Sequence, residues 1–67
     1  MNELARNLTE LLRRSGLMHK DVAKKIGVSR SAVLGYASGI RKPNPETIKK
    51  LCKALDCTYE ELLGPIE

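Results

Sequence analysis

The chain has 67 residues, carries 12 Lys or Arg against 8 Asp or Glu for a net charge of +4, and is 42% hydrophobic but only 3% aromatic. A chain of this length forms one domain, here residues 1–67, and buries only about 60% of its unfolded surface, which excludes a large core. Its apolar residues are spaced rather than continuous, so we expect neither a membrane span nor a signal peptide, and a cytoplasmic location.

The first predicted helix covers about Asn2 to Ser15. Asn2 is a good N-cap, and Gly16 is placed to end the helix. Glu10 and Arg14 form an exposed i,i+4 pair. The apolar face has the i, i+4, i+7, i+8 spacing of a helix that packs on a core, and its members are Leu4, Leu8, Leu11 and Leu12.

Two short helices joined by a tight turn are predicted next, at about His19 to Ile26 and Arg30 to Ser38. Gly27 ends the first helix, Val28 is apolar, and Ser29 is placed to cap the second. Two helices linked by about three residues that include glycine are typical of a helix-turn-helix. Their core-facing residues are Val22, Ala23 and Ile26, then Ala32, Val33, Tyr36 and Ala37.

A loop from Gly39 to Pro43 and two further helices complete the chain. The fourth helix starts at the N-cap Asn44 and ends at Asp56-Cys57, and the fifth runs from a capping box at Thr58 to the stop at Gly64-Pro65. The apolar face of the fourth helix consists of Ile48, Leu51, Cys52 and Leu55, and Leu62 and Leu63 are the expected core residues of the fifth. We therefore expect an all-α fold of five short helices and no strand. Its predicted core is Leu8, Leu12, Val22, Ala23, Ile26, Val33, Tyr36, Leu51 and Leu55.

The stretch from His19 to Gly39 resembles the helix-turn-helix of the phage-repressor and Cro family. That family reads roughly Leu-Ala-x-x-Ile/Leu-Gly-Val-Ser-x-Ser-x-Ile/Val, then an apolar residue three positions on, then Gly. The matching residues here are Val22, Ala23, Ile26, Gly27, Val28, Ser29, Ser31, Val33, Tyr36 and Gly39. The likeness covers about Leu4 to Gly64, and it implies a compact five-helix domain of the lambda-repressor type that binds double-stranded DNA.

The chain departs from the family pattern in the helices around this motif. Many relatives carry a buried Arg–Glu pair at the positions of Leu12 and Ala37, so packing replaces an ion pair here, which is often tolerated. Relatives usually have Ser or Thr where Met18 stands. Because Met cannot cap free amides, the start of the second helix is poorly signalled.

The resemblance places the third helix in the major groove of DNA. Arg30 and Ser31 hold the positions that reach base edges, and an arginine can present two donors to guanine O6 and N7. For Arg30, a phosphate contact or a solvated charge is the alternative. Leu34 could meet a thymine methyl group or another protein, and Gly35, which lacks a side chain, would let the helix backbone approach the DNA closely.

Phosphate contacts are expected on either side of that helix. The family pattern and the charges assign them to His19, Ser29, Ser38, Arg41 and Lys42, with a plain exposed histidine and solvated loop charges as alternatives. Such contacts position a protein without reading sequence. Their neighbour in the loop, Ile40, is expected to pack inward.

No metal, cofactor or catalytic site is predicted. Cys52 and Cys57 lack the further His or Cys ligands of a zinc site, so we expect buried, reduced thiols. His19 has no nucleophile at a recognisable spacing, and the chain has no Gly-rich phosphate loop. We therefore do not expect an enzyme.

The charge is unevenly distributed, with net +6 over residues 1–42 and net −2 over residues 43–67. A basic part that contains the helix-turn-helix suits a polyanionic partner.

We predict a bacterial or phage-type transcriptional regulator, a repressor, that binds a near-palindromic operator as a homodimer. The dimer contact is expected at the fifth helix and Leu63 to Ile66. The alternative is a protein-interaction module, such as an antitoxin or adaptor, which Leu34 and Gly35 favour. Whether a further domain follows is left open.

Overall fold

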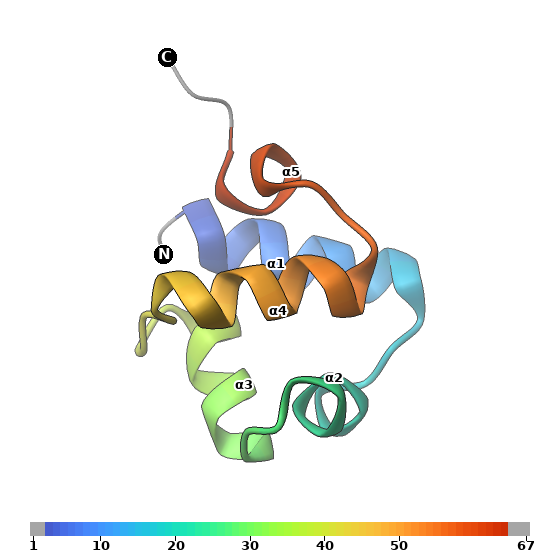
Figure 1. The fold of residues 1–67 in the computed structure, drawn as a ribbon, viewed down its shortest axis with the longest axis vertical. Helices are drawn as coiled ribbons and strands as arrows, with labels where there is room; N and C mark the ends of the chain where they lie inside the picture. Colours follow the sequence, from blue (N-terminus) through green and yellow to red (C-terminus); the bar gives the residue numbers. More distant parts are fainter. Residues whose placement is uncertain (1–2, 65–67) are drawn as a thin grey trace.

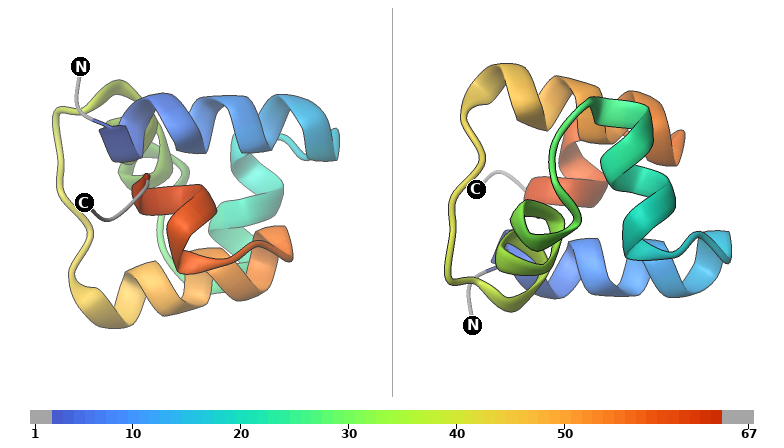
Figure 2. Two further views of the ribbon diagram at one scale, coloured as in Figure 1. Left: turned by 90° about the horizontal axis from the view of Figure 1, so that it is seen from above. Right: turned by 90° about the horizontal axis from the view of Figure 1, so that it is seen from below.

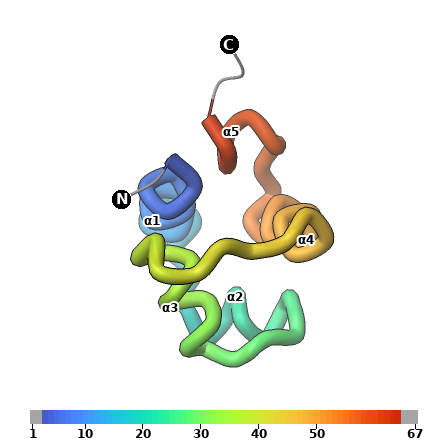
Figure 3. The backbone as a smooth tube through the Cα atoms, turned by 90° about the vertical axis from the view of Figure 1, so that its left-hand side faces the viewer, coloured from blue at the N-terminus to red at the C-terminus, as the bar shows by residue number. Residues whose placement is uncertain are grey.

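The computed structural model describes residues 3–64, which form five α-helices and no strand. The helices are α1 (Glu3–Ser15), α2 (His19–Ile26), α3 (Arg30–Ser38), α4 (Pro45–Leu55) and α5 (Tyr59–Leu63). In Figure 1, α1, α4 and α5 form an upper layer, and α2 and α3 lie beneath it. The segment between α3 and α4 crosses one side of the molecule (Figure 3). The predicted all-α, five-helix fold is confirmed. The expected cap Asn2 and the stop at Pro65 lie outside the described residues.

One hydrophobic core joins the two layers. All nine residues predicted for it are buried, and the core also includes Ala5, Leu11, Ala32, Ala37 and Leu62. Leu12 and Ala37 are both buried, as expected if packing replaces an ion pair at these positions. No polar or charged side chain of residues 3–64 is buried, so the core is apolar throughout. None of the helices in this range is long and apolar enough to cross a membrane.

Side-chain hydrogen bonds fix α1 against two other helices. The Asn7 Nδ2 group donates to the carbonyl of Leu62 at 3.1 Å, which ties α1 to α5. The Thr9 hydroxyl lies 2.9 Å from the carbonyl of Ala5 and 3.2 Å from that of Ala37, at the C-terminal end of α3. Because α3 touches α1 at this end, its N-terminal end is the one directed away from the upper layer (Figure 1).

The helix ends follow their local sequence signals. Ser29 Oγ accepts from the Ala32 amide at 3.1 Å, and Asn44 Oδ1 accepts from the Thr47 amide at 2.8 Å. At Thr58 both bonds of the predicted capping box are present. Gly27 takes the left-handed conformation at φ 74°, and its amide donates to the Ala23 carbonyl at 2.9 Å. These predicted caps are therefore confirmed.

The start of α2 has a signal that the sequence analysis missed. Met18 occupies the N-cap position, and the side chain of Asp21, three residues on, accepts its backbone amide at 2.9 Å. This is the returning half of a capping box, which needs an acidic residue at the third helical position but no polar side chain at the cap. It explains how α2 begins at His19 without Ser or Thr before it.

Three local predictions are wrong. Ile40 does not pack inward, because it follows Gly39, whose φ of 86° reverses the chain, and its side chain is 84% exposed. Leu63 is not a core residue, because consecutive helix positions point about 100° apart and Leu62 takes the buried one. The expected pair of Glu10 with Arg14 is replaced by Arg13, 2.6 Å from the Glu10 carboxylate. The Arg13 hydrogen bond lowers the pKa of Glu10.

Candidate nucleic-acid interface

The helix-turn-helix forms the lower layer of the molecule. The turn at residues 27–29 brings the C-terminal end of α2 to the N-terminal end of α3, and the right-hand view of Figure 2 shows both helices from this side. Val28 packs partly against the core, which holds the turn in place as expected. The arrangement leaves one long side of α3 exposed, since its other side carries the buried Ala32, Val33, Tyr36 and Ala37.

Arg30 is the first residue of α3 and is exposed. It shares a surface hollow with Lys20 and Lys24 of α2, and none of the three takes part in the ion pairs found within residues 3–64. Asp21 also lines the hollow, but its carboxylate accepts the Met18 amide. A cation at a helix N-terminus is opposed by the helix dipole. Three cations outnumber the one carboxylate of this hollow, that of Asp21, so the surface is net positive and favours an anionic partner.

The exposed side of α3 presents Ser31, Leu34 and Ser38, at i, i+3 and i+7. They line one hollow of about 490 Å³ together with Gly35, Ile40 and Arg41. Leu34 is 37% exposed, so an apolar side chain stands on a surface that is otherwise polar. Ile40, expected in the core, instead borders the same hollow. This side of α3 therefore offers both polar and apolar contacts.

Gly35 is covered by another residue. A Cβ atom built on Gly35 would lie 2.7 Å from Cδ and 2.8 Å from Cγ of Arg41, which is closer than carbon atoms approach one another. The Arg41 amide also donates to the Gly35 carbonyl at 3.1 Å. Gly35 is buried, so the expected close approach of its backbone to DNA would require Arg41 to move. The spacing of residues along α3 could not predict this contact, because Arg41 belongs to the loop that follows the helix.

The residues assigned to phosphate contacts are spread over several elements. His19 is half-buried at the first position of α2, and Lys42 is exposed in the α3–α4 loop. Ser29 Oγ accepts the Ala32 amide, which leaves its hydroxyl proton free to donate to another group. The Ser38 hydroxyl donates to the Gly35 carbonyl at 3.3 Å and would have to rotate to reach a phosphate.

Three lysines gather at a place that the linear charge count does not show. Lys25 of α2 and Lys50 and Lys53 of α4 line a hollow together with Ala54. The α4 lysines belong to the part of the chain with net negative charge, and only the packing of α2 on α4 brings them beside a helix of the basic part. A second positive hollow therefore lies at the contact of α2 with α4, where the distribution of charge along the chain did not predict one.

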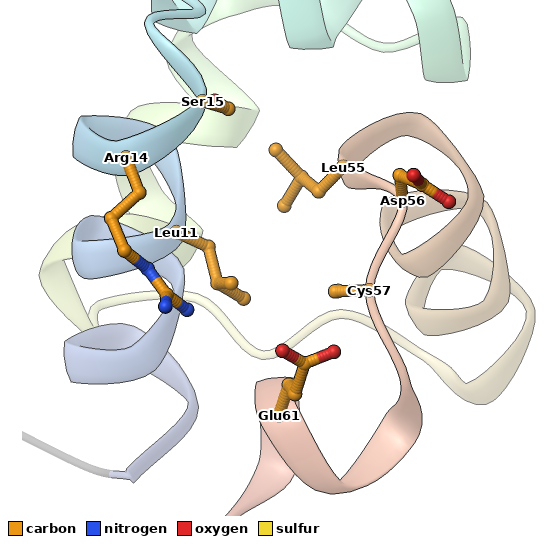
Figure 4. Close-up of a pocket in the computed structure, with 7 residues that line it drawn as sticks. All are labelled: Leu11, Arg14, Ser15, Leu55, Asp56, Cys57 and Glu61. Atoms are coloured by element: carbon orange, nitrogen blue, oxygen red, sulfur yellow. The ribbon is translucent and has the colours of Figure 1, made fainter.

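A further hollow, of about 240 Å³, lies between α1 and the α4–α5 junction, and Figure 4 shows the Cys57 side chain directed into it. Cys52 and Cys57 are free and half-buried. The pKa of the Cys57 thiol is raised to about 12, mainly by burial and to a lesser extent by the nearby Cys52. Thiolate is the form that binds metals, and at neutral pH this thiol is protonated. Residues 3–64 contain no group of three or more His, Cys, Asp or Glu arranged to hold a metal ion.

A helix-turn-helix whose second helix exposes a polar and cationic surface defines a DNA-binding domain of the kind used in transcriptional regulation. The chain belongs to the helix-turn-helix family, which it matches over residues 8–62. This confirms the predicted Cro/repressor-type resemblance and the predicted class of function.

Individual relatives agree with the family. The chain is 37% identical over 57 residues to the HTH-type transcriptional regulator AnsR of Bacillus subtilis. The matched stretch covers 85% of this chain and 49% of AnsR. It is similar to the restriction-modification controller protein C.AhdI from Aeromonas hydrophila, with a TM-score of 0.84 and 35% identity over 90% of this chain and 91% of that one. It is also similar to a transcriptional regulator from Listeria innocua, with a TM-score of 0.87 and 28% identity. That match covers 100% of this chain and 63% of the Listeria protein. The chain thus spans about half of AnsR.

Proposed function

We propose that this chain is a single cytoplasmic DNA-binding domain that recognises a specific duplex sequence and represses transcription. The observation that carries the proposal is the exposed side of α3, beside an arginine and two lysines without described acidic partners. Repression needs only that the protein occupies DNA that another protein must reach. AnsR and the Listeria innocua protein are named as transcriptional regulators, and C.AhdI as a controller protein, which agrees with this role.

The exposed residues divide into base contacts and phosphate contacts. We assign base contacts to Arg30, Ser31 and Leu34, because they lie on the first turns of the exposed side of α3. We assign phosphate contacts to His19, Ser29, Ser38 and Lys42, at helix ends and in the loop. Phosphate contacts set the position of the protein, and base contacts distinguish sequences.

The dependence of binding on salt tests the proposal. If the protein neutralises six to ten phosphates as a dimer, affinity for duplex DNA should fall roughly 10³- to 10⁵-fold between about 50 and about 200 mM salt. The measurement is a titration of a duplex selected from a random pool, with a scrambled duplex of the same length as the control. Equal affinity for both duplexes at every salt concentration would contradict sequence-specific binding.

We further propose that two copies bind one near-palindromic operator, with their α3 helices about 34 Å apart, one turn of DNA. The supporting observation is a largely apolar hollow between α1, α5 and the start of α4, where the 40% exposed Leu63 lies with Leu4, Pro43 and Ile48; Glu3 and Lys42 also line it. The other part of the expected contact, up to Ile66, lies outside the described residues.

Sedimentation of the complex should give two copies per operator at saturation. Leu63→Ser should raise the protein concentration needed for the second copy to bind, because it removes apolar area from the proposed contact. Met18→Ser, which changes another exposed apolar residue on a different surface, is the matched control and should leave the stoichiometry unchanged. One copy per operator in the parent protein would refute the dimer.

A protein-interaction module is the second candidate, and the exposed Leu34 and Ile40 on one hollow favour it. Binding of a protein through these side chains would bury apolar area and depend little on salt. A weak, salt-sensitive affinity for all duplexes, with no preferred sequence, would support this candidate over the repressor.

A further inference from the structure

Gly35 stands in the middle of α3, where glycine is among the least favourable residues. In the structure its missing side chain leaves a space, and the Cβ, Cγ and Cδ atoms of Arg41 lie 3.2, 2.8 and 2.7 Å from where a Cβ on residue 35 would be. Arg41 therefore fills the place of a side chain on α3, although it belongs to the loop that follows. The glycine makes this arrangement possible, since any larger residue would displace the arginine stem.

The arginine is held at its base and free at its tip. Its amide donates to the Gly35 carbonyl at 3.1 Å, and its aliphatic stem packs across the glycine. The ion pairs found within residues 3–64 are Glu3 with Arg6 and Glu10 with Arg13, so no described carboxylate takes up the Arg41 guanidinium. A side chain already fixed along most of its length loses less conformational freedom on binding than a loose one.

We propose that Arg41 reads a base in the major groove, as a replacement for the side chain that position 35 lacks, and that Gly35 is the residue that positions it. The inference rests on the proposed binding of duplex DNA by α3. It assigns to Arg41 a different target from the phosphate contact expected of a loop charge. Leu34 and Ser38, which line the same hollow, flank the contact.

The chemistry of the side chain suits this role. A guanidinium is planar and presents donors in a fixed fork, which matches the O6 and N7 acceptors of guanine. The next residue, Lys42, has a point charge on a flexible stem and suits a phosphate. Two adjacent cations of the loop would then do different work because only Arg41 is packed on α3.

Thermal unfolding tests the packing without any DNA. With Arg41→Ala in place, only its Cβ remains near residue 35, at 3.2 Å, and a shift of a few tenths of an ångström relieves that contact. Gly35→Ala in this background should raise the unfolding midpoint by about 4–8 °C, because alanine is the better helix residue. With Arg41 present, the same substitution should give no rise, because it expels the arginine stem. An equal rise in both backgrounds would show that Arg41 is not held by Gly35.

Binding of a selected operator and of its single-base variants tests the readout. Arg41→Lys keeps the charge and should keep the affinity for a scrambled duplex, but it should lose roughly 5- to 150-fold of discrimination at one position in each half-site. Gly35→Ala should lose discrimination at the same position, and in the Arg41→Ala background it should change binding less than about 2-fold.

Each contrary result has a distinct meaning. Full discrimination by Arg41→Lys would leave Arg41 as a phosphate contact and overturn the proposal. Additive losses from Gly35→Ala and Arg41→Ala would show that Gly35 does not act through Arg41. If the parent protein prefers no duplex, the proposed function fails and base reading fails with it, while the thermal result would still decide whether Gly35 holds Arg41 against α3.

Discussion

Leu62→Ala should lower the free energy of unfolding by about 2–5 kcal/mol, whereas Leu63→Ala should cost about 1 kcal/mol. The two leucines are neighbours in α5, but Leu62 is fully buried and Leu63 is 40% exposed. Removing the first leaves a cavity in the core between α5 and α1. Removing the second mainly shortens a side chain at the surface.

A loss of that size is a large part of the whole free energy of unfolding of so small a domain, since this free energy is roughly 0.05–0.15 kcal/mol per residue. The Leu62→Ala protein should therefore be partly or wholly unfolded near 37 °C. The measurement is denaturant unfolding followed by circular dichroism at two protein concentrations, because assembly through Leu63 would make stability depend on concentration. Equal losses from the two substitutions would mean that α5 does not close the core as the structure shows.

Much of the fold follows from signals that act within a few residues. The caps at Ser29, Asn44 and Thr58 each depend on a side chain and an amide three positions apart, so the sequence is enough to predict them. Apolar spacing likewise predicted every core residue of α2 and α3, because a helix repeats its faces every 3.6 residues. The half capping box of Asp21 also joins a side chain to an amide three positions away, so the sequence was enough to predict it as well.

The errors occur where the position of a side chain depends on distant parts of the chain. Ile40 is apolar, and only the path of the loop after Gly39 turns it outward. Gly35 looked like a place where the backbone could approach DNA, yet the next loop folds back and covers it with Arg41. In the candidate site, α3 and its first two residues followed from the sequence. The two groups of lysines, those beside Arg30 and those where α2 meets α4, could not be predicted in this way. Their positions depend on how the helices pack against one another.

Arg30→Ala and Lys42→Ala should weaken DNA binding in different ways, although each removes one exposed cation. Arg30 begins α3, and a bidentate contact with guanine contributes about 1–3 kcal/mol of discrimination. Its loss should relax the preference at one operator position in each half-site. Lys42 lies in the loop, and its loss should weaken all duplexes alike and lower the magnitude of the salt slope by about one unit per site. Ser31→Ala should resemble Arg30→Ala, with a smaller effect.

The stability of the variants separates a lost contact from a damaged fold. Arg30 is exposed at the positive end of the α3 dipole and has no described ion-pair partner, so Arg30→Ala should leave the unfolding midpoint unchanged or slightly raised. Operator and scrambled duplexes are then compared at two salt concentrations for each variant. If Arg30→Ala lowers both affinities equally and reduces the salt slope as Lys42→Ala does, Arg30 binds phosphate. Base reading would then fall to the other side chains proposed for it, Ser31 and Leu34 of α3 and Arg41 of the following loop.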